Sequence, residues 1–181
     1  RAAPTNRATR MKISEVLLAD FDSEIANTRR TLERVPEGKN DFRPHDKSMP
    51  LGKMAMHCAT LPLFGAYIME DDDMDMAAPR HPHADLAFTT RQRALGTLDE
   101  SAGRCRSALL RTTDEQLAAR WRFSFGETVI TNESRLRTYR SMFFNHLIHH
   151  VAQLGVYLRL TGEPVPALYG PSADESWAPP M

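Results

Sequence analysis

Apolar residues recur with a helical period in the first half of this chain. Residues 14–34 place their apolar side chains at steps of three and four, which predicts an amphipathic helix that ends before Pro36. A second apolar stripe follows Pro50, and Ser48 is the expected N-cap of the helix that carries it. This helix should end in the acidic run at residues 70–76, because carboxylates are unfavourable at a helix C-terminus.

The pattern changes in the second half of the chain. Residues 84–111 again show helical spacing, weakened locally by two glycines, and predict a third helix. Residues 121–130 then alternate bulky and polar side chains around Gly126. Such alternation is typical of a short hairpin or an extended crossover, and we expect no other strand-like part.

The last helical stretch, residues 136–160, is the longest without an interruption of the helical pattern and carries three of the seven histidines. Thr131 or Asn132 is expected to cap its start, and Gly162 to end it. At about 100° per residue, one stripe of side chains faces the core, with His150 in its middle. The stripe consists of Leu136, Tyr139, Phe143, Leu147, His150, Leu154 and Leu158.

Four long helices without a parallel-strand pattern predict an all-α protein, an antiparallel four-helix bundle in up-down order. In that order the second and the last helix run parallel. We expect one domain over residues 11–176, with the Pro-rich C-terminal tail packed back along the bundle as far as Glu175. Residues 1–10 are polar and basic and are interpreted as a disordered upstream extension or expression remnant, and residues 177–181 as a flexible C-terminus.

Composition narrows the class of protein. The 181 residues are 41% hydrophobic, which suits one domain with a single core, and the formal net charge is zero. Without a basic field, nucleic acid is not an expected partner. No apolar run approaches the roughly 20 residues of a membrane span, and two well-separated cysteines, Cys58 and Cys105, suit a reducing compartment. We therefore expect a cytoplasmic protein with no membrane partner.

Two histidines of the last helix form the first candidate site. His146 and His150 are about one turn apart, so both imidazoles point to the same side of the helix and can hold one metal ion. The alternative is a pair of ordinary histidines, each with its own hydrogen-bond partner. His149 projects about 130° from the stripe and is expected to be exposed, or at most to support the site. His57 flanks the core stripe of the second helix, close enough to lean into the bundle.

Three other features receive simpler interpretations. The acidic residues 70–76 lack the ligand spacing and the turn glycine of a calcium loop, and are interpreted as a solvated loop. His81 and His83 lie in a segment broken by prolines and are treated as surface residues. Cys58 follows His57 but points about 100° away in an ideal helix, so core packing is its expected role.

Two motifs resemble the DinB family of DNA-damage-inducible four-helix bundles, many members of which are assigned as metal-dependent enzymes. They are MPLGKMAMHCATLP around His57 and NHLIHHVAQLGVYLRLTGEPVPALYGPSADE around His146 and His150. The resemblance covers most of the chain, implies that these three histidines form a metal triad, and points to a homodimer. The family commonly has Arg-Gly after its last histidine, where this chain has Val151 and Ala152.

The chemistry that the resemblance implies rests on three neutral imidazoles, which leave an open coordination position on zinc, the first candidate, or nickel, the second. A bound water or low-molecular-weight thiol would have a lowered pKa there. We therefore expect an S-transferase or a hydrolase for a small-molecule substrate, with Gln153 and His149 on the supporting or substrate side. A peptidase is disfavoured, because no glutamate follows His146 to act as a base. The alternative is a non-catalytic metal- or ligand-binding bundle that forms a structural dimer.

Overall fold

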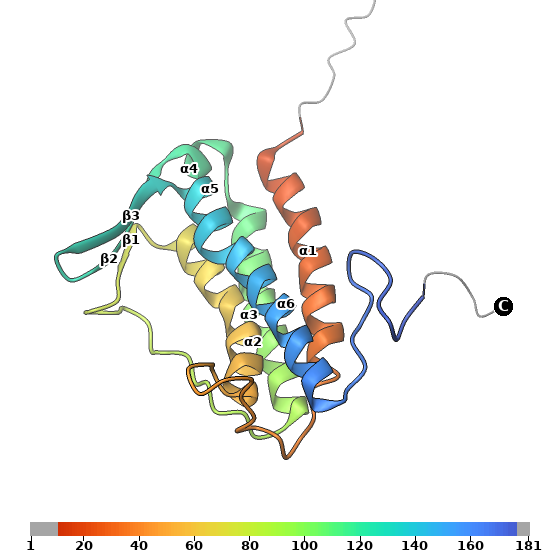
Figure 1. Ribbon diagram of the computed structural model, residues 1–181. Coiled ribbons are helices and arrows are strands. Elements are labelled where there is room, and N and C mark those ends of the chain that lie inside the picture. Colours follow the sequence, from red (N-terminus) through yellow and green to blue (C-terminus); the bar gives the residue numbers. More distant parts are fainter. Residues whose placement is uncertain (1–10, 177–181) are drawn as a thin grey trace, which may run out of the picture.

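The structure is a computed structural model that describes residues 11–176. The expectations for residues 1–10 and 177–181 therefore lie outside the described residues. Most of the described chain is helical, and a small sheet projects from one end of the helical bundle (Figure 1). The helices are α1 (Ile13–Leu32), α2 (Leu51–Glu70), α3 (Arg91–Arg111), α4 (Asp114–Ala118), α5 (Arg135–Thr138), the π-helix η1 (Tyr139–Phe144) and α6 (Asn145–Thr161). The strands are β1 (Asp73–Asp75), β2 (Arg120–Phe125) and β3 (Thr128–Ser134).

The bundle consists of α1, α2, α3 and the continuous run α5–η1–α6, and its helices do not alternate in direction. Residues 71–90 lead the chain back to the starting end of α2, so that α3 runs parallel to α2 and the last helix runs antiparallel to it (Figure 1). The predicted up-down order was therefore wrong. Twenty extended residues can span roughly 66 Å, more than the about 30 Å length of a 20-residue helix, so the connection is long enough for this return.

Side-chain contacts follow the same helix directions. Asp22 of α1 pairs with Arg106 of α3, and Arg29 later in α1 pairs with Asp99 earlier in α3, as expected for antiparallel neighbours. Ser101 of α3 donates its hydroxyl proton to the carbonyl of Ala59 in α2, at 2.6 Å. Gly65 of α2 lets the Phe143 ring approach to within contact distance. The core therefore lies between α2 and its two neighbours, α3 and the last helix.

The sheet contains one strand more than the sequence predicted. β2 and β3 form an antiparallel hairpin whose turn residue Gly126 has φ +56°. β1, which lies in the acidic run interpreted as a loop, pairs with β2 in parallel. The Asp75 carboxylate also accepts a hydrogen bond from the Gly126 N–H, at 2.8 Å. The β1–β2 pairing joins segments about 50 residues apart, so it cannot be predicted from the residue pattern of either segment alone.

The helix starts differ from the predicted ones. Pro50, and not Ser48, precedes α2, and the Leu51 N–H is satisfied by the carbonyl of Phe42 in the preceding loop. A loop carbonyl thus takes the place of a side-chain cap.

α3 begins at Arg91 and not near residue 84, because the Thr90 side chain caps it by accepting a hydrogen bond from the Arg93 N–H. The last helix is likewise capped by Ser134, whereas Thr131 and Asn132 belong to β3. For the last helix, several polar residues in a row can act as the cap, and the sequence does not distinguish among them.

The π-helix η1 changes the stripe that faces the core. The Asn145 N–H donates to the carbonyl of Arg140, five residues earlier, so the turn is wider than an α-helical turn. One row of buried side chains, Tyr139, Phe143, Leu147 and Val151, is consequently spaced by four residues across η1 and beyond it, with Phe144 buried beside this row. His150 was predicted in the middle of the stripe, but it is only half-buried, and Val151 occupies the core position.

Residues 163–176 have no helix or strand and lie against α1 and α6. Glu175 accepts hydrogen bonds from Arg30 and from the Ala167 N–H. Asp174 pairs with Arg159 and accepts from the Val165 N–H. Within residues 11–176, none of the helices is long and apolar enough to cross a bilayer.

The tight contact at Gly65 yields a stability prediction. A Cβ atom at Gly65 would lie 2.7 Å from the Phe143 ring and 2.9 Å from the Cys105 sulfur, and both neighbours are fully buried. We expect Gly65→Ala to lower the free energy of unfolding by about 1–3 kcal/mol in chemical denaturation. Gly103→Ala is the matched control: its Cβ meets nothing within 4 Å, so it should gain about 0.5–1 kcal/mol. Equal effects of the two variants would contradict this account of the core.

Candidate metal centre

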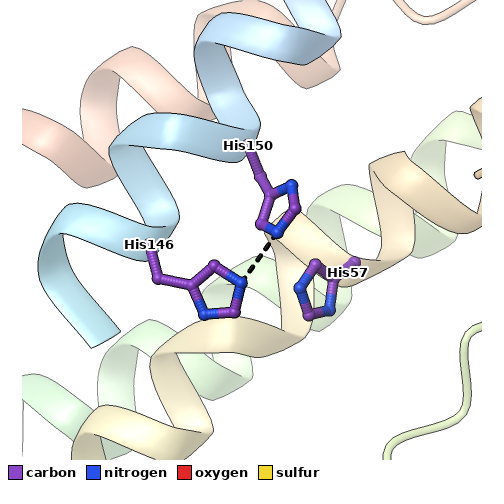
Figure 2. Close-up of side chains that lie close together, drawn as sticks. All are labelled: His57, His146 and His150. Carbon is purple, nitrogen blue, oxygen red and sulfur yellow. Dashed lines mark hydrogen bonds between the residues drawn. The ribbon is translucent and has the colours of Figure 1, made fainter. Parts of the chain in front are cut away.

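Three histidines from two helices meet at one point in the bundle. His57 projects from α2, and His146 and His150 project from α6 toward it (Figure 2). One ring nitrogen of each lies within 4.8 Å of the others, and the ring centroids are 4.5 to 5.3 Å apart. No other group of three or more His, Cys, Asp or Glu side chains within residues 11–176 is arranged to hold a metal ion. His57 is the seventh residue of α2, so the site lies well inside the helix and not at one end of the core.

Hydrogen bonds fix the orientation of the two rings on α6. His146 Nδ1 lies 3.2 Å from the carbonyl oxygen of Met142, and His150 Nδ1 lies 2.8 Å from Oε1 of Gln153. Because an oxygen acceptor requires a hydrogen on the nitrogen, Nδ1 is the protonated nitrogen in both neutral rings. Each Nε2 atom then carries a free lone pair, and these two atoms are only 2.7 Å apart. Two facing lone pairs at this distance repel each other unless a cation lies beside both.

The surroundings keep the three imidazoles neutral. Burial is the main cause that lowers the pKa of His57, to about 4, and the neighbouring His150 and His146 lower it further. Burial also lowers the pKa of His146 and of His150, although the contacts with Met142 and Gln153 oppose the shift. Neutral imidazole is the form that binds metal. The protein therefore holds the cluster in the state that a ligand set requires.

The remaining candidates occupy supporting or separate positions. His149 is exposed, although its ring centroid lies 5.1 Å from that of His150. Gln153 contacts His150 directly and orients it. Cys58 is fully buried, and burial raises the pKa of its thiol to about 12, so it remains a protonated core residue. Val151 and Ala152, which depart from the family pattern, line a groove on the other side of α6, away from His57.

A pocket of about 520 Å³ opens beside the cluster and includes His57 and His146 in its wall. None of its lining residues, all within the described part of the chain, carries a carboxylate or a permanent positive charge. The pocket is built by α2, by residues 74–86 of the crossover, by β2 and by η1. Its apolar wall includes Leu61, Phe64, Met74, Met76, Phe123 and Met142.

His81, expected at the surface, is in fact half-buried in the wall of this pocket. Its Nε2 atom is 2.7 Å from a carboxylate oxygen of Asp71, and its ring stacks on that of Tyr67 with centroids 3.9 Å apart. His83 lines the same pocket but is exposed. The sequence alone could not predict that His81 is half-buried, because its stacking partner, Tyr67, lies on another element, α2.

A family model described as the DinB superfamily matches residues 20–154. The chain belongs to this superfamily. This match agrees with the resemblance that the sequence motifs indicated. The structure has the four-helix core and the cluster of three histidines that the resemblance implied. A comparison with curated proteins found no match.

Solved structures with the same fold come from Bacillus species. A DinB-like protein of Bacillus subtilis, YjoA, is 20% identical, with a TM-score of 0.62 over 83% of this chain and 96% of its own. A DinB-like protein of Bacillus cereus ATCC 10987 is 17% identical, with a TM-score of 0.63 over 89% of this chain and 100% of its own. YfiT of Bacillus subtilis is 16% identical, with a TM-score of 0.60 over 90% of this chain and 94% of its own. YfiT is described as a probable metal-dependent hydrolase with an unusual four-helix bundle topology.

The lowered pKa of His57 gives a pH prediction for the metal-free protein. Its pKa of about 4 lies below the ordinary value of 6.5, so between these pH values the unfolded chain binds more protons than the folded chain. We therefore expect the free energy of unfolding to decrease as the pH falls from about 6.5 to about 4. Denaturation of His57→Leu, which lacks the titrating group, should show a shallower decrease over this window. An unchanged slope in this variant would contradict the burial of a neutral imidazole.

Proposed function

We propose that this protein is a metal-dependent enzyme in which His57, His146 and His150 hold a divalent ion, zinc as the first candidate and nickel as the second. The observation that carries the proposal is the approach of the Nε2 atoms of His146 and His150 to 2.7 Å beside the His57 ring, while both Nδ1 atoms face oxygen acceptors. Three neutral imidazoles with no carboxylate among them suit zinc or nickel better than calcium or magnesium.

The residues around the cluster would perform separate tasks. Met142 and Gln153 hold the two rings of α6 in the tautomer that presents Nε2. The apolar wall of the pocket excludes water from the face where His57 and His146 are accessible. A divalent ion held by three ligands would lower the pKa of a water or thiol at its open position. Either step starts a reaction on a small-molecule substrate bound in the pocket.

Between the two reactions, the pocket favours thiol transfer over hydrolysis. Water attack commonly requires a general base within hydrogen-bond reach, and no Asp or Glu lines the pocket within the described residues. A thiolate is a strong nucleophile that needs no general base, so an apolar pocket without carboxylates suits it. The description of YfiT as a probable metal-dependent hydrolase supports the hydrolase as the second candidate.

Metal analysis of histidine variants tests the ligand set. We expect about one divalent ion per chain in the wild type, with His57→Ala, His146→Ala and His150→Ala each weakening binding by at least about 100-fold, since loss of a mere supporting hydrogen bond already costs about 10–100-fold. His149→Ala is the matched control on the same helix and should bind metal as the wild type does, because His149 is exposed. The measurement is competition with a chromophoric chelator. Loss of metal in His149→Ala with retention in His146→Ala would overturn the proposed ligand set.

The cobalt-substituted protein distinguishes an enzyme from a non-catalytic bundle. A thiol that takes an open position should produce a new absorption band and a concentration-dependent spectral change. A site that binds cobalt but responds to neither thiols nor small anions would instead support the alternative, a metal- or ligand-binding bundle with a structural role.

We also propose that the protein is a homodimer. Val156 and Leu160 lie one turn apart on α6 and are 56% and 55% exposed, next to the apolar groove between α1, α6 and the tail. Self-association through a two-fold axis is the common way to cover such a face. Sedimentation should show a dimer at micromolar concentration, and Val156→Lys should raise the dissociation constant by at least about tenfold. Val129→Lys, in the hairpin and 50% exposed, is the control; a monomeric wild type would remove the proposal.

A further inference from the structure

The lining of the pocket beside the histidine cluster extends along α2. It includes His57 as well as Tyr67, and His81 of the crossover, which stacks on Tyr67. Tyr67 follows His57 by ten residues of α2, so about 15 Å of helix axis separates them at 1.5 Å per residue. Between the two ends, the wall is formed by apolar side chains such as Leu61, Phe64 and Met74. The pocket therefore suits a long, mainly apolar molecule better than a compact one.

The far end of the pocket is a fixed polar structure. The rings of His81 and Tyr67 are parallel, with an interplanar angle of 1°, and the Arg104 guanidinium lies 4.8 Å from the Tyr67 centroid. Asp71 holds His81 through Nε2, and its own backbone carbonyl accepts from the Trp121 indole, at 3.1 Å. Tyr67 is only 9% exposed. The two rings are therefore held rigidly where the pocket meets the crossover segment.

Two polar atoms at this end have no partner within residues 11–176. His81 makes its hydrogen bond through Nε2 alone, which leaves Nδ1 free, and the Tyr67 hydroxyl makes none. With Nε2–H donating to the Asp71 carboxylate, Nδ1 is the ring atom left for a ligand and accepts a hydrogen bond when it carries no proton, and the Tyr67 hydroxyl can donate or accept. The two groups together can bind one hydroxyl or amide group of a ligand.

The distance decides between two roles for His81. A group that transfers a proton in the reaction must lie within about 3 Å of the reacting atom, or reach it through one water. His81 stacks on Tyr67, whose place on α2 is about 15 Å along the helix axis from that of His57, and this separation disfavours that role. A role in recognising the unreactive end of a substrate agrees with both the distance and the free acceptor.

We infer that Tyr67 and His81 form a second recognition point, which binds a neutral hydroxyl or amide group at the far end of an elongated, apolar substrate whose reactive end reaches the three histidines. This inference rests on the proposed function. Asp71 is a positioning residue in it, because its carboxylate fixes the tautomer and orientation of His81.

Two matched series of thiols of increasing length test the inference. Hydroxyalkanethiols of increasing length, from mercaptoethanol to mercaptoundecanol, and the corresponding alkanethiols without the hydroxyl are titrated into the cobalt-substituted protein. Affinity is read from the thiolate-to-cobalt absorption. We expect no benefit of the terminal hydroxyl in short probes, and about threefold to tenfold tighter binding in a probe long enough to span the pocket.

Variants identify the residues that read the hydroxyl. In His81→Phe, which retains a ring to stack on Tyr67, the benefit of the hydroxyl should disappear while alkanethiol affinity is kept. Tyr67→Phe removes only an oxygen atom and should reduce the same benefit, so the test survives if His81→Phe does not fold. His45→Phe is the control, since His45 is an exposed histidine that does not line the pocket, and should keep the benefit.

The outcomes separate this inference from the proposed function. Cobalt binding and a thiol band, with no hydroxyl benefit at any length, would overturn the second recognition point and leave the metal site intact. A benefit that persists in both His81→Phe and Tyr67→Phe would overturn it as well. If the protein never binds cobalt, the proposed function fails, but the second recognition point can still be tested on the metal-free protein. Mercaptoundecanol should then shift the ring resonances of His81 in NMR spectra more than undecanethiol does. Equal shifts would overturn the inference.

Discussion

The antiparallel contact between α2 and the last helix is the interaction on which the candidate site depends. It is fastened at one end by the Arg135 guanidinium, which donates to the carbonyls of Ile68 and Asp71, and at the other by the Tyr157 hydroxyl, which donates to the carbonyl of Met49. Between these ends, Gly65 lets the two helices approach closely. The histidines meet because both helices are held in one register along their whole length.

The same contact explains what the sequence could and could not predict. Helical spacing indicated that His146 and His150 share a side, because an i, i+4 relation is local and needs no partner. The direction of α3 could not be predicted, because the spacing of apolar residues is the same for a helix that runs in either direction. β1 and the stacking of His81 on Tyr67 depend on partners in other elements. The sequence therefore predicted the helices and the residues of the cluster better than the topology and the pocket.

The histidine cluster and the helix that leads to it contain polar groups that reduce the stability of the fold. Three half-buried imidazoles share one space, and about two turns before His146 the Thr138 and Tyr139 hydroxyls are buried without a hydrogen-bond partner within residues 11–176. Both features are unfavourable for folding, because buried polar groups lose their contacts with water. Sequence patterns that conflict with local stability are expected where a function requires them. The rest of the core, by contrast, is apolar and closely packed.

The π-helix η1 separates α5 from α6, so the side chains of these two segments need not follow one continuous α-helical spacing. An added residue in an α-helix rotates everything beyond it by about 100°, and the wide turn at Tyr139–Phe144 absorbs such a rotation locally. The upstream segment, α5, can thus keep Thr138 directed at the core while the downstream segment, α6, directs His146 and His150 at α2. Mutations that repack one segment need not turn the other, so the bundle and its histidine cluster are free to diverge separately in evolution.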